Sequence, residues 1–231
     1  MVGGTADSVN ADNVGPEVKL FMDDYKFVYG GLTNENPLFI AKLFDENGVN
    51  TIGRGIGREL MLVIDGDNTK AIPVNDYYKA QTNSYQQGEV RYPLKNMAAG
   101  KHTATLKAWD TYNNSSEITT EFIVATSENL ALQHVLNYPN PFSTNTTFHF
   151  DHNKVGENLT VSLQIFTISG KLAKTLTYQT VATQSHFDQL TWNGTDDYGD
   201  KLANGVYIYK IKVRSDSGKT AEATQKLVIL N

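Results

Sequence analysis

The sequence Asn137-Tyr138-Pro139-Asn140-Pro141-Phe142 divides the chain into two blocks. Its two prolines are separated by one residue, so they fix φ at two nearby positions and remove two amide donors. Neither a helix nor a central strand can continue through such a stretch. Because strand-like sequence lies on both sides, we expect a junction between two β-domains, with residues 126–137 as the linker that leads into it.

Behind the junction, apolar and polar residues alternate in the way that is typical of half-buried strands. In residues 159–165 the odd positions are leucine, valine or isoleucine, and the even positions are polar. The same period recurs in residues 207–213, after Asn204-Gly205. A strand points alternate side chains to opposite faces, so each segment should bury one face. A last strand is expected at residues 225–230.

The block ahead of the junction has the same character. Apolar runs at residues 17–22, 38–44 and 59–64 are bounded by Gly, Asn, Pro and Asp, which punctuate strands. Residues 102–110 alternate, and residues 117–124 return after a polar turn. We expect Ile118, Phe122 and Val124 to share one face of the returning strand, and Pro93 to place residues 90–94 at a sheet edge.

No helical period competes with these strands over a useful length. The sequence therefore predicts an all-β chain of two tandem immunoglobulin-like antiparallel β-sandwich domains. The first domain is expected at residues 16–125 after a linker at residues 1–15, and the second at residues 138–231.

Composition excludes several classes of function. The formal net charge is -5 and no basic run occurs, which argues against binding to nucleic acid or to an anionic membrane surface. There is no cysteine, so this chain has neither a disulfide nor a cysteine nucleophile. No apolar run is long enough for a transmembrane helix. The start lacks the features of a secretory signal, so a signal for export is expected outside this chain.

Three patterns could carry metal or nucleotide chemistry. His149-Phe150-Asp151-His152 is the densest group of metal ligands, but zinc would need further ligands from elsewhere, and a solvent-facing strand edge explains it as well. Acidic turns at residues 45–48, 65–68 and 196–200 could hold calcium, although Asp and Asn also favour turns by themselves. The glycines of residues 53–58 precede no helix, so we interpret them as a mobile connection rather than a phosphate-binding loop. No cofactor is therefore expected, with calcium left open.

Several short motifs resemble a known family of domains. The second block resembles the C-terminal sorting domain of the type IX secretion system, and about equally the immunoglobulin-like domain of flagellar hook-capping proteins, with which it shares Trp192-Asn193-Gly194-Thr195-Asp196. Its position at the C-terminus favours the sorting domain. The motifs that carry this resemblance are Tyr138-Pro139-Asn140-Pro141-Phe142, Ile168-Ser169-Gly170-Lys171, Asn204-Gly205-Val206-Tyr207 and Lys226-Leu227-Val228-Ile229.

The first block is similar to the region that precedes the sorting domain in the PorU family, the sortases of type IX secretion. This similarity is carried by Asp45-Glu46-Asn47-Gly48-Val49-Asn50, Gly55-Ile56-Gly57, Asn75-Asp76-Tyr77-Tyr78, Tyr92-Pro93-Leu94, Gly100-Lys101-His102-Thr103 and Trp109-Asp110-Thr111-Tyr112-Asn113-Asn114. Together the resemblances cover most of residues 16–231. The catalytic part of the family is a gingipain-like cysteine peptidase, and the lack of cysteine means that its activity cannot reside in this chain.

The resemblance implies a non-catalytic tail that is exported and held peripherally at the outer membrane, on the cell surface. Its expected partners are an outer-membrane β-barrel protein of the PorV type and other type IX components. A terminal strand with unpaired amides is suited to adding an edge to such a partner, although it could equally complete its own sheet. The residues implied in sorting or partner binding are Tyr138, Pro139, Asn140, Pro141, Gly170, Lys171, Gly205, Tyr207, Lys226, Leu227, Val228, Ile229 and Leu230.

Two other classes of function stay open at the level of sequence. The aromatic residues Tyr77, Tyr78, Tyr85 and Tyr92 could form a platform for stacking sugars, as in a surface adhesin or a carbohydrate-binding pair of sandwiches. An assembly module like the hook cap is the other alternative. An upstream peptidase with a His and Cys dyad would favour the sorting tail over both.

Overall fold

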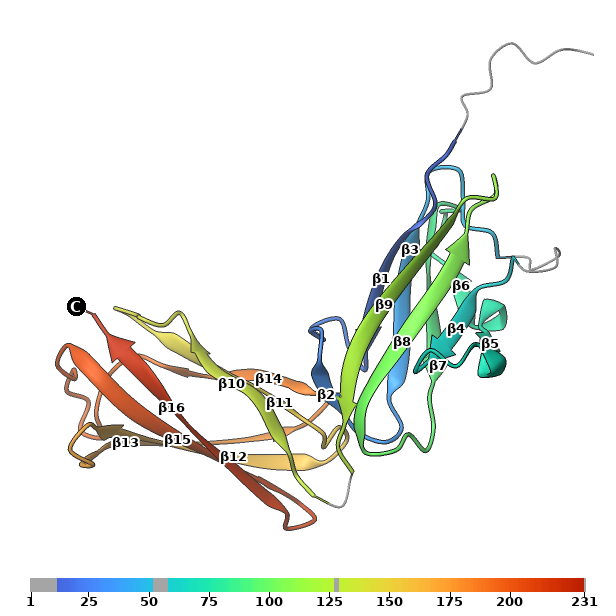
Figure 1. Ribbon diagram of the computed structural model, residues 1–231. Coiled ribbons are helices and arrows are strands. Elements are labelled where there is room, and N and C mark those ends of the chain that lie inside the picture. Colours follow the sequence, from blue (N-terminus) through green and yellow to red (C-terminus); the bar gives the residue numbers. More distant parts are fainter. Residues whose placement is uncertain (1–11, 52–57, 127–128, 231) are drawn as a thin grey trace, which may run out of the picture. The chain divides into compact units, whose positions relative to one another are not determined.

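The computed structural model describes residues 12–51, 58–126 and 129–230 (Figure 1). Within these residues it contains strands and two single-turn 3-10 helices, η1 (Asn68–Lys70) and η2 (Asn75–Tyr77). The strands are β1 (Glu17–Met22), β2 (Gly31–Thr33), β3 (Leu38–Phe44), β4 (Met61–Ile64), β5 (Ile72–Pro73), β6 (Tyr78–Ala80), β7 (Gln87–Pro93), β8 (Gly100–Trp109), β9 (Ser115–Val124), β10 (Leu132–Tyr138), β11 (Thr146–His152), β12 (Asn158–Thr167), β13 (Leu172–Val181), β14 (His186–Trp192), β15 (Gly205–Ser215) and β16 (Thr220–Ile229).

The strands ahead of the junction form two sheets, in the orders β1-β3-β7-β6 and β2-β9-β8-β4-β5. The alternation in β8 has the predicted effect, because Ala104, Leu106 and Ala108 are fully buried between more exposed neighbours. On β3, Phe39 is also fully buried. Most neighbouring strands whose pairing is described are antiparallel, but the short strand β2 runs parallel to the end of β9.

One local expectation for this block is wrong. Strand β7, which ends at Pro93, lies between β3 and β6 and is not an edge strand. Proline is tolerated there because it is the last residue of the strand. On β9, Ile118 shares its face with Phe122 and Val124, but only the latter two are buried, while Ile118 is 40% exposed near the start of the strand.

The strands behind the junction form a second pair of sheets, in the orders β10-β11-β14 and β13-β12-β15-β16 (Figure 1). The predicted alternation is confirmed, because the odd positions of β12 and β15 enter one continuous apolar core. The core also receives Phe148 and Phe150 from β11, Trp192 from β14 and Leu227 from β16. The fold class predicted from the sequence, tandem β-sandwiches, is thereby confirmed.

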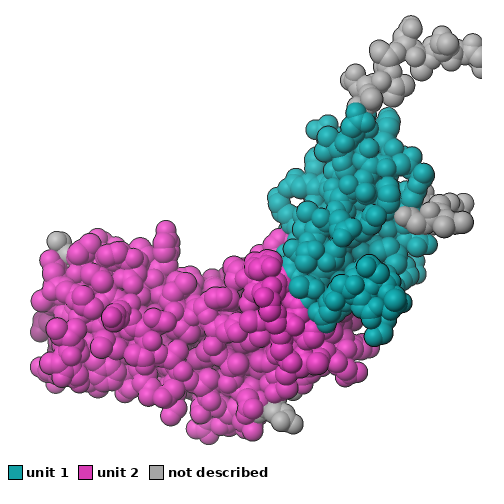
Figure 2. Space-filling view, in the orientation of Figure 1, with its two compact units in different colours: residues 1–20, 39–92, 103–120 teal, residues 21–38, 93–102, 121–231 magenta. Residues whose placement is uncertain are grey.

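The chain divides into two compact units (Figure 2). The first contains the described parts of residues 1–20, 39–92 and 103–120, and the second contains residues 21–38, 93–102 and the described parts of 121–231. The domain boundaries expected from the sequence stay a prediction. Among the described residues, no helix has the length and apolar character needed to span a bilayer.

Candidate functional site

The junction folds back onto the last strand. The side-chain amide of Asn140 donates to the carbonyl oxygen of Lys226 at 3.2 Å, and its Oδ1 accepts the Val228 N–H at 3.0 Å. The Phe142 N–H donates to the Val228 carbonyl at 3.1 Å, and the Leu230 N–H donates to the Phe142 carbonyl at 2.8 Å. The outer edge of β16 at its C-terminal end is therefore occupied by the chain itself, and those amides are not open to a partner strand.

Buried contacts hold the junction in this position. The side chain of Asn137 donates to Thr146 Oγ1 at 3.0 Å, and Thr146 Oγ1 donates to the Pro139 carbonyl at 2.8 Å. The peptide bonds that precede Pro139 and Pro141 are both cis. Phe142 is buried and its ring lies edge-on to Trp192, with 5.7 Å between centroids. Phe142 thus anchors the junction in the core of the second sandwich.

The other residues implied in sorting are brought to the same end of this sandwich. Gly205 pairs with Ile229, and Tyr207 pairs with Leu227, across β15 and β16. Tyr207 also pairs on its other side with Thr167, which begins the turn that contains Gly170 and Lys171. Tyr207 is nearly buried and its hydroxyl donates to the Ala203 carbonyl at 2.9 Å, so its role here is structural.

Large apolar side chains are exposed at this same end. They come from the end of β10, from the β12–β13 turn and from strands β13 and β15, and from the last residues of the chain: Tyr138, Ile168, Leu172, Val206 and Leu230. Val206 points outward because its neighbour Tyr207 faces the core. Cross-strand partners share a face, so Val206 and Val228 lie together on the outer side of the sheet. We call the five exposed residues together with Val228 the terminal apolar patch.

The outer side of the same sheet also carries a row of cations. Lys210, Lys212 and Arg214 alternate with buried residues along β15, so they share the outer face with Val206. Lys210 Nζ lies 2.9 Å from a carboxylate oxygen of Glu222 on β16. In a chain whose net charge is -5, this face is locally positive.

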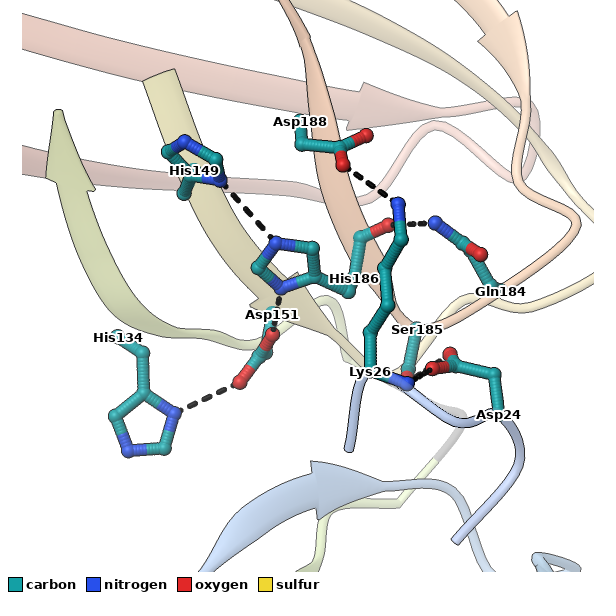
Figure 3. A network of polar contacts seen from close by, with 9 residues as sticks. All are labelled: Asp24, Lys26, His134, His149, Asp151, Gln184, Ser185, His186 and Asp188. Atoms are coloured by element: carbon teal, nitrogen blue, oxygen red, sulfur yellow. Dashed lines mark hydrogen bonds and ion pairs between the residues drawn. The ribbon is translucent and has the colours of Figure 1, made fainter. Parts of the chain in front are cut away.

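A polar network lies on the other sheet of this sandwich (Figure 3). Asp151 on β11 is nearly buried and accepts two histidine contacts: His186 Nδ1 lies 2.7 Å from Oδ1, and His134 Nδ1 lies 2.7 Å from Oδ2. His149 Nδ1 in turn lies 3.3 Å from His186 Nε2. The sequence motif therefore contributes His149 and Asp151 to a cluster, and His134 and His186 complete it from β10 and β14.

Burial and charge act in opposite directions on the pKa values of this cluster. Burial raises the pKa of Asp151, but the hydrogen bonds from His186 and His134 outweigh it and lower the pKa below its usual value. The bond to Asp151 raises the pKa of His186. Burial and the charge of His186 lower the pKa of His149. His152, which is buried on the opposite face, has its pKa lowered by burial to about 4 and is neutral at pH 7.

Residues 21–38, which belong to the same compact unit, reach this network. Lys26 Nζ lies 2.6 Å from Asp188 Oδ2 on β14, and Ser185 Oγ donates to Asp24 at 3.3 Å (Figure 3). Sequence reasoning did not find these contacts, because nothing local marks residues so distant along the chain as neighbours.

The acidic turns differ in what surrounds them. Asp45 lies with Asp12 and Asp110, and a carboxylate oxygen of each is within 4.8 Å of the others, an arrangement that could hold a hard cation such as calcium. Asp65 and Asp196 instead accept backbone N–H groups, from Thr103 and from residues of the turn itself. Calcium binding at these turns stays a prediction, as does the absence of any cofactor.

The tyrosines predicted as a platform for sugars do not all lie together. The Tyr77 and Tyr92 rings pack edge to face, with 4.8 Å between centroids and 78° between planes. Tyr85 is exposed in a separate loop, and Tyr78 is half-buried. The stacking platform stays a prediction. The glycine-rich stretch at residues 53–58, and with it Gly55-Ile56-Gly57, lies outside the described residues except for Arg58.

Comparison with protein families accounts for the second sandwich. Residues 137–230 match the family described as the secretion system C-terminal sorting domain. The chain carries a type IX secretion sorting domain. The matched range begins at the junction and ends with the last strand, so it covers β11 to β16 of the second sandwich but leaves out most of β10. The resemblance predicted from the sequence motifs is confirmed.

Solved structures extend the similarity to the whole chain. The dimeric latent PorU from Porphyromonas gingivalis is 31% identical, with a TM-score of 0.50, over 99% of this chain and 21% of that chain. The chain thus spans about a fifth of the PorU chain that it matches. Fibronectin(III)-like modules of Clostridium thermocellum CbhA match 93% of this chain and 93% of that chain, at 10% identity and a TM-score of 0.32. A search of curated proteins found no match.

Proposed function

We propose that the chain is the non-catalytic C-terminal region of a secreted sortase-type cysteine endopeptidase of the type IX secretion system. The observation that carries this proposal is the similarity to PorU over 99% of the chain. The region would direct export through the sorting domain and keep the enzyme peripherally attached at the outer membrane. The parent enzyme would cleave sorting domains from its cargo and attach the cargo to surface lipopolysaccharide.

The proposal that this region is non-catalytic rests on its composition and its polar contacts. A cysteine peptidase needs a thiolate nucleophile, and the sequence of 231 residues contains no cysteine. His134 and His186 are each bonded to Asp151, and neither contacts a hydroxyl or a thiol in the described structure. The peptidase activity would therefore belong to another part of the parent protein.

Docking to a β-barrel partner of the PorV type, among other type IX components, would use the terminal apolar patch. Its exposed side chains are the kind that a protein interface buries at its centre. The outer cations of β15 would add attraction to an acidic rim on the partner. The edge of β16 is blocked by Asn140 and Phe142, so strand addition would be confined to its free part at residues 220–224.

A binding assay with the purified β-barrel partner tests this surface. Val206→Asp places a charge in the patch and should weaken capture of the barrel at least ten-fold, because a buried unpaired charge opposes docking. Val181→Asp is the matched control, because Val181 is similarly exposed but lies at the opposite end of β13. This variant should capture the barrel as the wild type does.

Equal capture by both variants would contradict the patch as the docking surface. The export role is tested separately, by removing this chain from the full-length protein and measuring the amount that reaches the cell surface. Undiminished surface display would contradict the sorting function itself.

A further inference from the structure

The ring nitrogens of His149 and His186 lie at a distance that suits two ligands of one metal ion. His149 Nδ1 and His186 Nε2 face each other at 3.3 Å on the outer side of the β11–β14 ladder (Figure 3). This separation is longer than the ~2.9–3.0 Å that is most common for N–H groups bonded to oxygen. Two imidazoles on one tetrahedral Zn²⁺, with Zn–N bonds of ~2.0–2.1 Å, have nitrogens about 3.4 Å apart.

The other nitrogen of His186 is held as in a zinc site. His186 Nδ1 contacts Asp151, which leaves Nε2 directed at His149. Metal-binding histidines characteristically use their second nitrogen to contact a carboxylate, which fixes the ring and its tautomer. Asp151 is held in turn by His134. The carboxylate that orients the ring is itself nearly buried and paired on both oxygens.

Irregular backbone delivers these side chains. The pairing of β11 with β14 shifts register between Phe148 and Phe150, so His149 lies at the irregularity. The pairing of β10 with β11 shifts register between Gln133 and Leu136, and His134 has a positive φ of 48°. Register shifts of this kind re-aim side chains, and a non-glycine residue in this region of φ is uncommon. Both irregularities converge on the same cluster.

We propose that His149 and His186 bind a divalent metal ion of the zinc class, with Asp151 and His134 as positioning residues. Nδ1 of His149 and Nε2 of His186 supply two ligands, and water completes the coordination because both rings are partly exposed. Imidazole nitrogen selects zinc, copper or nickel over calcium and magnesium. The bound ion would join β14, the outer strand of its sheet, to β11.

Calorimetric titration of the intact chain with ZnCl₂ tests the site. Wild-type protein should bind one zinc ion, and His149→Ala and His186→Ala should each weaken binding at least ten-fold. The control is His102→Ala, since His102 contacts the Ala98 carbonyl, outside this cluster, and this variant should bind zinc as the wild type does. Asp151→Asn should weaken binding about 10–100-fold if the carboxylate orients the ring.

Two measurements keep the result independent of whether a variant folds. NMR of wild-type protein should show zinc-induced shifts of the His149 and His186 ring resonances, with those of His102 unmoved. Co²⁺ should give the visible absorption of a tetrahedral nitrogen-ligated ion in the wild type only. If zinc binds the double variant of His149 and His186 as tightly as the wild type, or moves neither ring resonance, the contact is only a hydrogen bond and the proposal fails.

Discussion

The N–H of Leu230 donates to the carbonyl of Phe142 at 2.8 Å, so the end of the last strand is bonded to the junction that begins the sorting domain. This contact connects the junction motif directly to the motif of the last strand. The junction is more than a connection between blocks, because it covers the edge that the terminal strand would otherwise present. Covering an edge in this way prevents unwanted pairing with another chain.

Asn140 should contribute measurably to the stability of the sorting domain. Its side chain makes one bond to the Lys226 carbonyl and one to the Val228 amide. Asn140→Ala should lower the free energy of unfolding by about 1–2 kcal/mol and speed hydrogen exchange at the Val228 amide. Asn204→Ala, at an exposed position before β15, serves as control and should change neither. An unchanged exchange rate in Asn140→Ala would show that the cap does not protect the edge.

The two tyrosines of β15 should respond oppositely to loss of the hydroxyl. The Tyr209 hydroxyl is buried and has no hydrogen-bond partner in the described structure, whereas the Tyr207 hydroxyl donates to Ala203. Tyr209→Phe should leave stability unchanged or raise it by about 1 kcal/mol, and Tyr207→Phe should lower it by about 1 kcal/mol. Chemical denaturation of both variants measures this difference, and a large loss in Tyr209→Phe would reveal a partner for that hydroxyl.

His152 should make the domain sensitive to acid. Burial lowers its pKa from 6.5 to about 4, so the folded state disfavours the protonated ring. The free energy of unfolding is therefore highest above pH 6.5 and should fall by up to about 3 kcal/mol as the pH falls toward 4. His152→Gln should flatten the pH dependence in this window. Equal slopes of unfolding free energy against pH in both proteins would contradict the assignment.

Asp23 should make the stability of the protein depend on pH in the opposite direction. Burial raises the pKa of its carboxyl to about 6, and Oδ2 is buried without a hydrogen-bond partner in the described structure. The folded state therefore holds the proton more tightly than the unfolded state, and stability falls as the pH rises from about 4 to 6. The loss should be about 1–3 kcal/mol, since the side chain is only partly buried.

The variant Asp23→Asn tests this second pH dependence. Asparagine can retain the bond from the Leu38 N–H and tolerates the positive φ of 62° at this position. It should raise stability at pH 7 and remove the decline between pH 4 and 6. A variant that is less stable than the wild type at pH 7 would show that the ionised carboxylate is stabilising.

The sequence alone determined the class of fold and the nature of the second domain. Period-two alternation in β8, β12 and β15 is a local property, because a strand assigns alternate residues to opposite faces whatever it packs against. The motifs around Pro139 and Gly205 are also local, since each is short and contiguous. They were therefore sufficient to indicate the sorting domain.

Tertiary structure decided where those motifs meet and which side chains cooperate. The cap of Asn140 and Phe142 on β16 joins segments from opposite ends of the domain, and no local pattern encodes such a pairing. The contact of His149 with His186 depends on a register shift between two strands, and a shift of one residue would send either ring to the opposite face. Side-chain direction is local, but register is set by the packing of the whole sheet.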